Sequence, residues 1–491
     1  MSAVASTSHP PDPVTLAPFP LLAGDPEFYR PGTFDLDGLG VRAWINVFRR
    51  SIPSFARHVE GDAQLAGLGR DASAAAARTF AHRYGAALDR ILDPTTRSEP
   101  VPGLEACPAA EAASWHQRRP GANPAAGACI IRLCRLRETL LRDLGYPDVF
   151  RATKEAENAA ATRVLPALVA ELDAGRLDDQ ADGLGAGGQG TPTRFAALLR
   201  GCLAGNIFDL GAATTAEMAA AEAAEGKGGD ASVALFHKAR AGLLPRPWAA
   251  GCDDVNAAAC ALSAGRPDSS VLVFVDNAGA DTILGVVPLA RELLREGDGG
   301  VRAGAVVLLA NDAPSINDVT FDELQSLLGR PGAPGPLALA DPILGAAIAQ
   351  GRLRAAPSGN DLCVLDLACV GPAARAEAIL AGTRRVAARG GREKRDDCSV
   401  VRAFFATKTR GGVPLPPWRR PLVVLIGMGR GIETNLHARL MCDSLRLGMV
   451  KHPEVAASLG GREGSSEPCR MLDGVVRFLP GEGIQGSRQV E

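Results

Sequence analysis

Two apolar runs, Val271–Val275 and residues 305–310, each lead into side chains that can bind a cation. Asp276 and Asn277 follow the first run directly, and Asp318 lies in the polar segment after the second. Short runs rich in β-branched residues are typical of strands buried in a parallel sheet, whose ligands bind at the carboxyl ends of the strands. Carboxylate and amide oxygens suit Mg²⁺ and Mn²⁺. We therefore expect Asp276, Asn277 and Asp318 to bind one divalent cation and to act in catalysis.

The residues between the two runs help to decide between this site and a simpler interpretation. Asp276 and Asn277 also suit a helix cap or a turn, and a single polar strand end would favour that interpretation. The segment from Ile283 to Leu294 has helical spacing, so the two runs and this helix form a β-α-β unit. Right-handed connections of this kind place the two strand ends side by side, which favours a binding site.

A third apolar run, Pro421–Ile426, leads into a glycine-rich turn. We expect a helix to follow from about Thr434 to Gly448, so that the turn offers free backbone N–H groups to an anion. An arginine in the turn adds a guanidinium that suits phosphate oxygens. The sequence therefore predicts a phosphate site formed by Gly427, Met428, Gly429 and Arg430.

Three other polar residues are candidates for substrate binding. Lys451 lies beyond the predicted helix and could add a second positive charge to the phosphate site, or it could be an exposed cation near a helix end. Asn206 and Asp209 lie three positions apart and share one face of a predicted helix at 195–209. Spacing alone favours a helix-end cap for this pair.

The chain as a whole predicts an α/β fold, with a three-layer α/β/α domain built on a mainly parallel sheet and preceded by a mainly helical N-terminal region. Residues 1–18 are predicted to be disordered, 19–232 to be helical with low-complexity insertions, and 233–491 to form the α/β/α domain. The arginine-rich stretch 384–420 is predicted to be an insertion, and a solvated loop is a better interpretation of its charge than contact with nucleic acid. Amphipathic spacing predicts N-terminal helices at Trp44–Phe55, Ala72–Leu92, Ile130–Leu144 and Phe150–Leu172.

Composition limits the class of protein. The chain has 491 residues, a formal net charge of −2 and 46% hydrophobic residues, so it can bury a core and lacks the positive charge typical of nucleic-acid-binding proteins. Its 11 cysteines contain no CxxC pair, which argues against a four-cysteine zinc site and is typical of reduced thiols in the cytosol. No apolar run reaches the roughly 18 residues of a membrane span, and no targeting segment is visible. We expect a cytoplasmic protein that binds neither nucleic acid nor a membrane.

The segments that carry these residues resemble the metal-dependent damage-control phosphatases. FVDNAGAD at 274–281, PSINDVT at 314–320 and GMGRGIETN at 427–435 are most similar to the subfamily that hydrolyses 4′-phosphopantetheine. That subfamily includes stand-alone plant enzymes and the phosphatase domain fused to some pantothenate kinases. The helical region is similar too, in its FPLL, SIPSF, LCRLRE and K-x-x-EN segments, as is the SGND segment at 358–361.

The resemblance implies a phosphatase that depends on Mn²⁺, Ni²⁺, Co²⁺ or Mg²⁺. The implied partners are small phosphorylated metabolites, namely 4′-phosphopantetheine, its oxidised forms and small sugar phosphates, and the resemblance does not indicate which proteins, if any, bind the chain. Asn206 and Asp209 fall in a GN-x-x-D-x-G segment that lies close to the active site in the family. The implied reaction is metal-assisted in-line attack of water. A phosphorylated Asp276 ranks second, because the DNAG motif lacks the second aspartate of the haloacid-dehalogenase pattern.

The chain departs from the subfamily at Ile426, where the subfamily has glutamate before Gly-Met-Gly-Arg. A carboxylate there is expected to lie near the metal and Arg430, so its absence predicts weaker metal binding or slower turnover, and Ile426→Glu is predicted to raise activity. The alternative is a catalytically weakened pseudo-phosphatase that binds a phosphorylated ligand. A nucleotide-dependent methyltransferase or oxidoreductase is disfavoured, because no glycine fingerprint follows the first strand.

Overall fold

The computed structural model describes residues 36–93, 130–175, 191–207, 248–297, 300–367, 370–371, 421–461 and 467–481. All helices, strands and contacts reported below fall in these ranges. Three predicted features lie outside them, namely the disorder at 1–18, the insertion at 384–420 and the position of Asp209.

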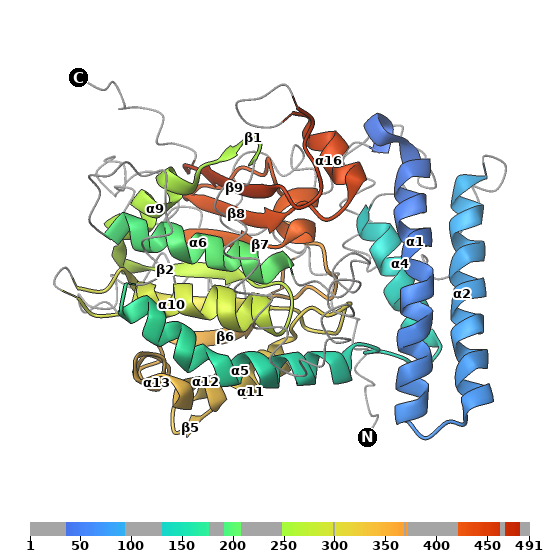
Figure 1. The fold of residues 1–491 in the computed structure, drawn as a ribbon, viewed down its shortest axis with the longest axis horizontal. Helices are drawn as coiled ribbons and strands as arrows, with labels where there is room; N and C mark the ends of the chain where they lie inside the picture. The colour runs from blue at the N-terminus through green and yellow to red at the C-terminus, as the bar shows by residue number, and fades with distance from the viewer. Residues whose placement is uncertain are drawn as a thin grey trace, which may run out of the picture.

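A seven-stranded, mainly parallel sheet forms the centre of the molecule (Figure 1). Its strand order is β1-β9-β8-β7-β2-β3-β6, and β8 and β9 are the antiparallel neighbours. The sheet confirms the predicted α/β class. Its strands are β1 (Trp248–Asp253), β2 (Arg266–Phe274), β3 (Ala303–Ala310), β6 (Leu353–Pro357), β7 (Leu422–Ile426), β8 (Ser444–Met449) and β9 (Gly474–Leu479), and β4 (Gly329–Arg330) and β5 (Ala333–Pro334) form a separate hairpin.

The three predicted strands, β2, β3 and β7, lie next to one another in this sheet. β2 pairs in parallel with both neighbours, so that Val271 lies opposite Leu422 on one side and Val306 on the other. Successive residues of β2 point to opposite faces, and Val273 and Phe274 are both buried, in different clusters. Burial on both faces explains the unbroken apolar run. Because the three strands are parallel, their carboxyl ends meet at one edge.

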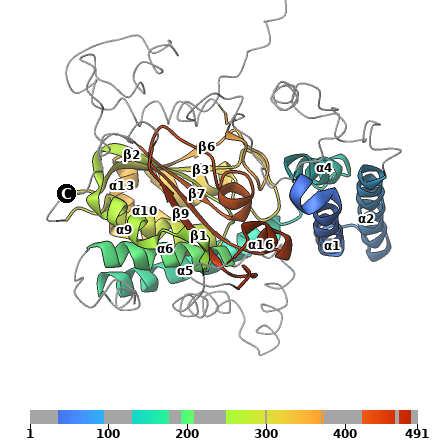
Figure 2. The same ribbon diagram turned by 90° about the horizontal axis from the view of Figure 1, so that it is seen from above.

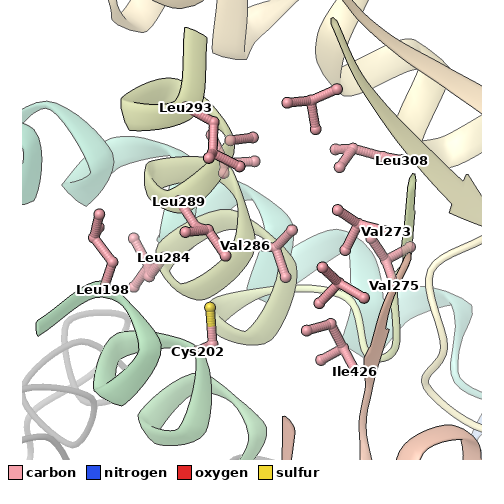
Figure 3. Packing of buried hydrophobic residues seen from close by; sticks show 14 of the residues in the cluster. Leu198, Cys202, Val273, Val275, Leu284, Val286, Leu289, Leu293, Leu308 and Ile426 are labelled. Atoms are coloured by element: carbon pink, nitrogen blue, oxygen red, sulfur yellow. The ribbon is translucent and has the colours of Figure 1, made fainter. Parts of the chain in front are cut away.

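One face of the sheet is covered by helices (Figure 2). Figure 3 shows Leu289 between Leu198 and the strand residue Val273. Two of these helices precede the predicted domain boundary at residue 233, yet they pack in the same cluster as β2 and β3. Within the described ranges, the opposite face packs against Leu365, Leu367, Val370, Ala438, Leu440 and Cys442. The helices on the first face are α5 (Arg151–Asp173), α6 (Thr191–Ile207), α9 (Val255–Ala264), α10 (Val287–Leu294), α11 (Phe321–Leu328), α12 (Pro336–Ala340) and α13 (Pro342–Ala349).

After β2 and a short segment at 275–280, the chain forms a π-helical turn, η3 (Asp281–Val286), which continues into α10. Helix α6 lies directly against this turn. A Cβ atom on Gly205 would lie 2.8 Å from the Cα atom of Asp281. A Cβ atom on Gly285 would lie 3.1 Å from the Cα atom of Cys202. Glycine at both positions therefore allows α6 to reach the end of β2.

Three N-terminal helices stand beyond the carboxyl edge of the sheet (Figures 1 and 2). Trp44 and Phe55 lie in one apolar cluster with Met428 and Val450, so these helices share a core with the strand ends. The predicted helical N-terminal region is confirmed. Among the helices that the structure describes, none has both the length and the apolar composition that crossing a membrane requires. The three helices are α1 (Leu36–Leu65), α2 (Arg70–Leu92) and α4 (Ile130–Asp143).

The predicted helix from Thr434 to Gly448 is wrong. The chain forms a π-helical turn, η6 (Met428–Glu433), and then the strand β8, which pairs in parallel with β7. Arg446 obscured the strand, because a charged side chain is rare in the interior of a sheet. Its buried guanidinium donates to backbone oxygens such as that of Asn435, at 3.0 Å, so the charge is accommodated.

Candidate active site

Backbone pairing joins the end of β2 to the segment that follows β3. Asn277 and Asp318 form an antiparallel bridge, and the backbone N–H of Val319 donates to the carbonyl of Asp276 at 2.9 Å. All four residues are buried. The structure therefore brings together the three predicted metal ligands, Asp276, Asn277 and Asp318.

Arg430 lies between the two carboxylates of this group. Its guanidinium donates to Asp276 and, at 2.5 Å, to Oδ2 of Asp318. Oδ1 of Asn311 accepts a further hydrogen bond from it at 3.1 Å. Burial would lower the pKa of Arg430, but Asp318 and Asp276 raise it instead. The arginine predicted to bind phosphate is thus an ion-pair partner of both predicted carboxylate ligands.

Asn206 anchors the other oxygen of Asp276. Its Nδ2 donates to Oδ2 of Asp276 at 3.0 Å and to Oδ2 of Asp281 at 2.9 Å. Nδ2 of Asn277 makes the same two contacts, at 3.2 Å and 3.0 Å. Oδ1 of Asn206 accepts from the backbone N–H of Met449 at 3.1 Å. Asn206 therefore connects α6 with the ends of β2 and β8, which a helix-end cap would not do.

Three buried carboxylates share this region with two cations. Burial raises the pKa of Asp276 well above its ordinary value, and Asp318 and Asp281 add to this against the opposing charge of Arg430. Burial also raises the pKa of Asp281. Lys451 is buried, and its charge lowers the pKa of both Asp276 and Asp281, which places it near them. A divalent cation bound here would favour the charged forms of these carboxylates.

Several buried oxygen atoms of the site have no hydrogen-bond partner within the described residues. They are the Oδ1 atoms of Asn277, Asp281 and Asn317. Because buried polar atoms are nearly always paired, oxygens in this state beside carboxylates fit a hard divalent cation. No group of three His, Cys, Asp or Glu side chains in the described ranges is arranged to hold a metal. The donor set here instead combines carboxylates with amide oxygens, and Arg430 lies between the carboxylates.

A cavity of about 120 Å³ opens onto Asp276 and Asn277. Two cationic side chains, Arg137 of α4 and Lys451 from the segment after β8, contribute to its polar lining. Helix α1 contributes apolar side chains to the lining. The cavity therefore combines a charged floor with an apolar wall, which suits an anionic group attached to an apolar organic group. The α1 residues of this wall are Trp44, Val47, Phe48 and Phe55.

The glycine-rich turn contacts the site through its backbone. Gly427 has a φ of 97°, and a Cβ atom there would lie 2.0 Å from Oδ2 of Asp276, so the position requires glycine on both counts. Met428 lines the cavity, and its sulfur accepts from the backbone N–H of Lys451 at 3.2 Å. Because η6 is a single π-helical turn, the positive charge at this edge comes from Arg430 and Lys451 rather than from a long helix.

Helix α5 holds the turn that follows β2. Oδ1 of Asn158 accepts from the backbone N–H of Gly279 at 2.8 Å. Gly279 has a φ of 68°, and a Cβ atom there would lie 2.7 Å from that of Glu157. The K-x-x-EN segment, which contains Glu157 and Asn158, therefore supports the residues that follow β2.

Ile426 lies in the apolar core rather than in the polar cluster. Its side chain is fully buried, and Figure 3 shows it beside Val275, below Val286. This position therefore lies in an apolar cluster, whereas the prediction placed a carboxylate there near the metal and Arg430. A glutamate here would have to place its charge among apolar side chains.

Four residues of the site were not among the predicted metal ligands or substrate-binding residues. Asp281 and Asn317 stand inside the two aspartate-containing segments, and Arg137 stands inside LCRLRE, so a signal for all three was present. Asn311 follows β3 directly and had the same signal as Asn277. Their roles depend on contacts between distant segments, which no local pattern reveals.

Comparison with known proteins identifies relatives of the chain. The model of the damage-control phosphatase ARMT1-like domain matches residues 47–366. A damage-control phosphatase of Arabidopsis thaliana is 36% identical over 425 residues, which is 86% of this chain and 85% of that protein. The chain is 13% identical to a solved DUF89 family protein of Pyrococcus horikoshii, with a TM-score of 0.39 over 86% of this chain and 98% of the other.

Two further relatives are longer proteins. A 4′-phosphopantetheine phosphatase of Mus musculus is 30% identical over 68% of this chain and 38% of its own length. Pantothenate kinase 2 of Oryza sativa is 30% identical over 91% of this chain and 40% of its own length. The chain thus spans less than half of each of these two relatives.

Proposed function

The chain belongs to the damage-control phosphatases with an ARMT1-like domain, and from this premise we propose that it is a divalent-cation-dependent phosphatase of small phosphomonoesters. The proposed substrates are 4′-phosphopantetheine and its oxidised forms, as the name of the mouse relative suggests. The observation that carries the proposal is the group of three buried carboxylates at the strand ends, with unpartnered buried oxygens beside them within the described residues.

Asp276, Asn277 and Asp318 would hold the cation, which we propose to be Mn²⁺, Ni²⁺, Co²⁺ or Mg²⁺. When bound, such a cation supplies Lewis acidity to a phosphoryl oxygen and makes water a better nucleophile at neutral pH. Oxygen donors are common to these metals, so the side chains present do not select among them.

The contacts of Asp276 support attack by water over a phosphorylated aspartate. Its Oδ1 accepts from Arg430, and its Oδ2 accepts from Asn206 and Asn277. A carboxylate has about four lone-pair sites, so Asp276 can accept these hydrogen bonds and still bind a cation. A nucleophile must in addition approach the phosphorus in line, and donors on both oxygens hinder that approach. Asp276 is therefore assigned a binding and positioning role.

The cavity accounts for the other parts of the proposed substrate. Lys451 and Arg137 stand on its polar side and would bind the phosphate and stabilise the charge that develops during transfer. The wall formed by α1 would pack against the organic group and exclude water. Small sugar phosphates lack an apolar group of this kind, so we rank them below the pantetheine esters.

Phosphate release by the purified chain tests the proposal. Chelation with EDTA should abolish release, and addition of Mn²⁺, Ni²⁺, Co²⁺ or Mg²⁺ should restore it. Asp318→Asn should lower kcat/KM by at least roughly 10²-fold, because it removes a charged ligand. Asp312→Asn is the matched control, since Asp312 lies in the same segment but accepts from Gly359 N–H outside the cluster.

Two results would argue against a phosphatase. Release that is unaffected by EDTA would exclude the cation site. Binding of 4′-phosphopantetheine in calorimetry without any hydrolysis would favour the alternative, a pseudo-phosphatase that binds a phosphorylated ligand.

A further inference from the structure

Two cysteines meet where the N-terminal helices contact the cavity. Cys134 belongs to α4, and Cys363 belongs to the segment after β6, yet their sulfur atoms are 3.7 Å apart. Cys134 is buried in the same apolar cluster as Trp44 and Phe55, and Cys363 lines the cavity together with Asp276 and Asn277. The pair therefore joins a distant helix to the edge of the candidate active site.

Arg137 makes the environment of the two sulfurs unequal. Its Nη2 donates to Sγ of Cys363 at 3.5 Å, and the same nitrogen pairs with Glu138 at 2.7 Å. The hydrogen bond with Cys134 lowers the pKa of the Cys363 thiol, and the charge of Arg137 lowers it further against the effect of burial. The same hydrogen bond and burial raise the pKa of Cys134. Cys363 is thus the more readily ionised sulfur, with a thiol donor beside it.

The segment that carries Cys363 also contacts the polar cluster. A Cβ atom on Gly429 would lie 2.2 Å from the carbonyl oxygen of Cys363, so the backbone here touches the glycine-rich turn. The carbonyl of Leu362 accepts from Nδ2 of Asn311 at 3.0 Å, and this same amide donates to Asp318 at 2.9 Å. A displacement of Cys363 would therefore disturb the Asn311 amide and the hydrogen bond that this amide donates to Asp318.

We propose that Cys134 and Cys363 are a redox-sensitive pair that hydrogen peroxide converts into a disulfide, and that this disulfide lowers the activity of the site. The Cys363 thiolate attacks one peroxide oxygen, the O–O bond breaks, and hydroxide leaves, which produces a sulfenic acid. The sulfur of Cys134 then attacks the sulfenic sulfur, the S–O bond breaks, and water leaves with the thiol proton. Two thiols are oxidised, and one peroxide is reduced to two waters.

The effect on activity follows from the change in distance. A disulfide bond is about 2.05 Å long, so the two sulfur atoms must approach each other by more than an ångström from their 3.7 Å contact, and the residues that carry them must adjust. A misplacement of about 1 Å in an active site can lower the rate roughly 10²-fold. This part of the inference rests on the proposed phosphatase function.

Mass spectrometry of the peroxide-treated full chain tests the bond itself. After alkylation of free thiols, trypsin and Asp-N should release the peptide at 133–135 linked to that at 361–365, and dithiothreitol should separate them. Asp-N cuts between Cys363 and Cys369, so the assignment is unambiguous. Cys260 is exposed and is the control, because oxidation governed by exposure alone would modify it first. Modified Cys260 with no link between Cys134 and Cys363 would overturn the proposal.

Activity before and after peroxide tests the consequence. Phosphate release should fall roughly 10²-fold and recover with dithiothreitol. Cys134→Ser should keep its basal rate and lose the sensitivity, whereas Cys260→Ser should remain sensitive. A linked chain with an unchanged rate would overturn the inhibitory effect. If the chain releases no phosphate under any condition, the proposed function fails, while the linked peptide still decides whether the pair forms a disulfide.

Discussion

Asp276 is the residue on which the contacts of the site converge. One oxygen accepts from Arg430 and the other from Asn206 and Asn277, so the carboxylate is held by donors from three separate parts of the chain. A buried carboxylate needs such partners, because desolvation disfavours its charge. Its orientation therefore depends on neighbours that must not be displaced.

At this scale, the Gly427→Ala exchange should disrupt the site. A Cβ atom would lie 2.0 Å from Oδ2 of Asp276 and must displace that carboxylate. We expect kcat/KM for phosphate esters to fall roughly 10²-fold, as a shift of about 1 Å suffices for this. Gly460→Ala is the control, since Gly460 has a φ of 79° but open space around it. It should lower stability by about 1–2 kcal/mol and leave kcat/KM unchanged. Equal kinetic effects in both variants would contradict the steric argument.

Ile426→Glu is the second prediction at the residue scale, and the structure reverses its direction. The side chain lies in the apolar core beside Val275, so an ionised glutamate would be buried among apolar groups (Figure 3). We expect the free energy of unfolding in urea to fall by several kcal/mol, with no gain in phosphate release. Ile426→Gln separates the polar effect from the charge and should be less destabilising at neutral pH. A stable Ile426→Glu variant with raised activity would show that the carboxylate reaches the polar cluster.

At the scale of elements, the contact between α6 and η3 places Asn206. Backbone approaches backbone there, because Gly205 and Gly285 have no side chains. A π-helical turn such as η3 departs from regular helix geometry and is common at functional sites. Here it begins at Asp281, the residue that shares the amide of Asn206 with Asp276.

Gly205→Ala tests this contact. Its Cβ atom would meet the Cα atom of Asp281 at 2.8 Å, so α6 must move away and carry Asn206 with it. We expect a loss of stability of about 1–3 kcal/mol and weaker metal binding in calorimetry. On the same helix, a Cβ atom added to Gly201 would meet no neighbouring atom within 4 Å. Gly201→Ala should therefore stabilise the chain by about 0.5–1 kcal/mol. If both variants stabilise the chain, the close approach of α6 and η3 is incorrect.

At the scale of the whole molecule, the N-terminal helices complete a cavity that the sheet alone would leave open. The strand ends supply the charged floor, and α1 supplies the apolar wall. Arg135 and Arg142 of α4 both form ion pairs with Asp361 in the segment after β6. These ion pairs connect the N-terminal helices to the sheet. The proposed function therefore assigns substrate selection and phosphate chemistry to different regions of the chain.

Val47→Ala tests this division. Val47 lines the cavity, so its truncation should raise KM for 4′-phosphopantetheine roughly tenfold through lost apolar contact. KM for a small ester such as acetyl phosphate should change little. Val59→Ala is matched in chemistry and is also on α1, but it lies in the helical core away from the cavity lining. It should lower the unfolding temperature without altering either KM. An equal change in KM for both esters would show that α1 does not contact the organic group.

The sequence by itself determined the elements around the site. The apolar runs before Asp276 and Gly427 and the helical spacing of the N-terminal region depend on local periodicity, which the structure preserves. It also determined that the residues after β2 and β3 lie close together, because parallel strands end at one edge. The helix predicted at 434–448 failed, since the burial of Arg446 in β8 depends on acceptors that only the folded chain provides.

Only the tertiary structure decided what the polar residues do. Asn206 reaches Asp281 across 75 positions, and Arg430 reaches Asp276 across 154, so these contacts exist only once the order β7-β2-β3 and the packing of α6 are established. The same holds for Cys134 and Cys363, which are separated by 229 positions and meet because α4 packs against the segment after β6. Local patterns record the period of an element, whereas the partner of a buried charge is set by which elements become neighbours.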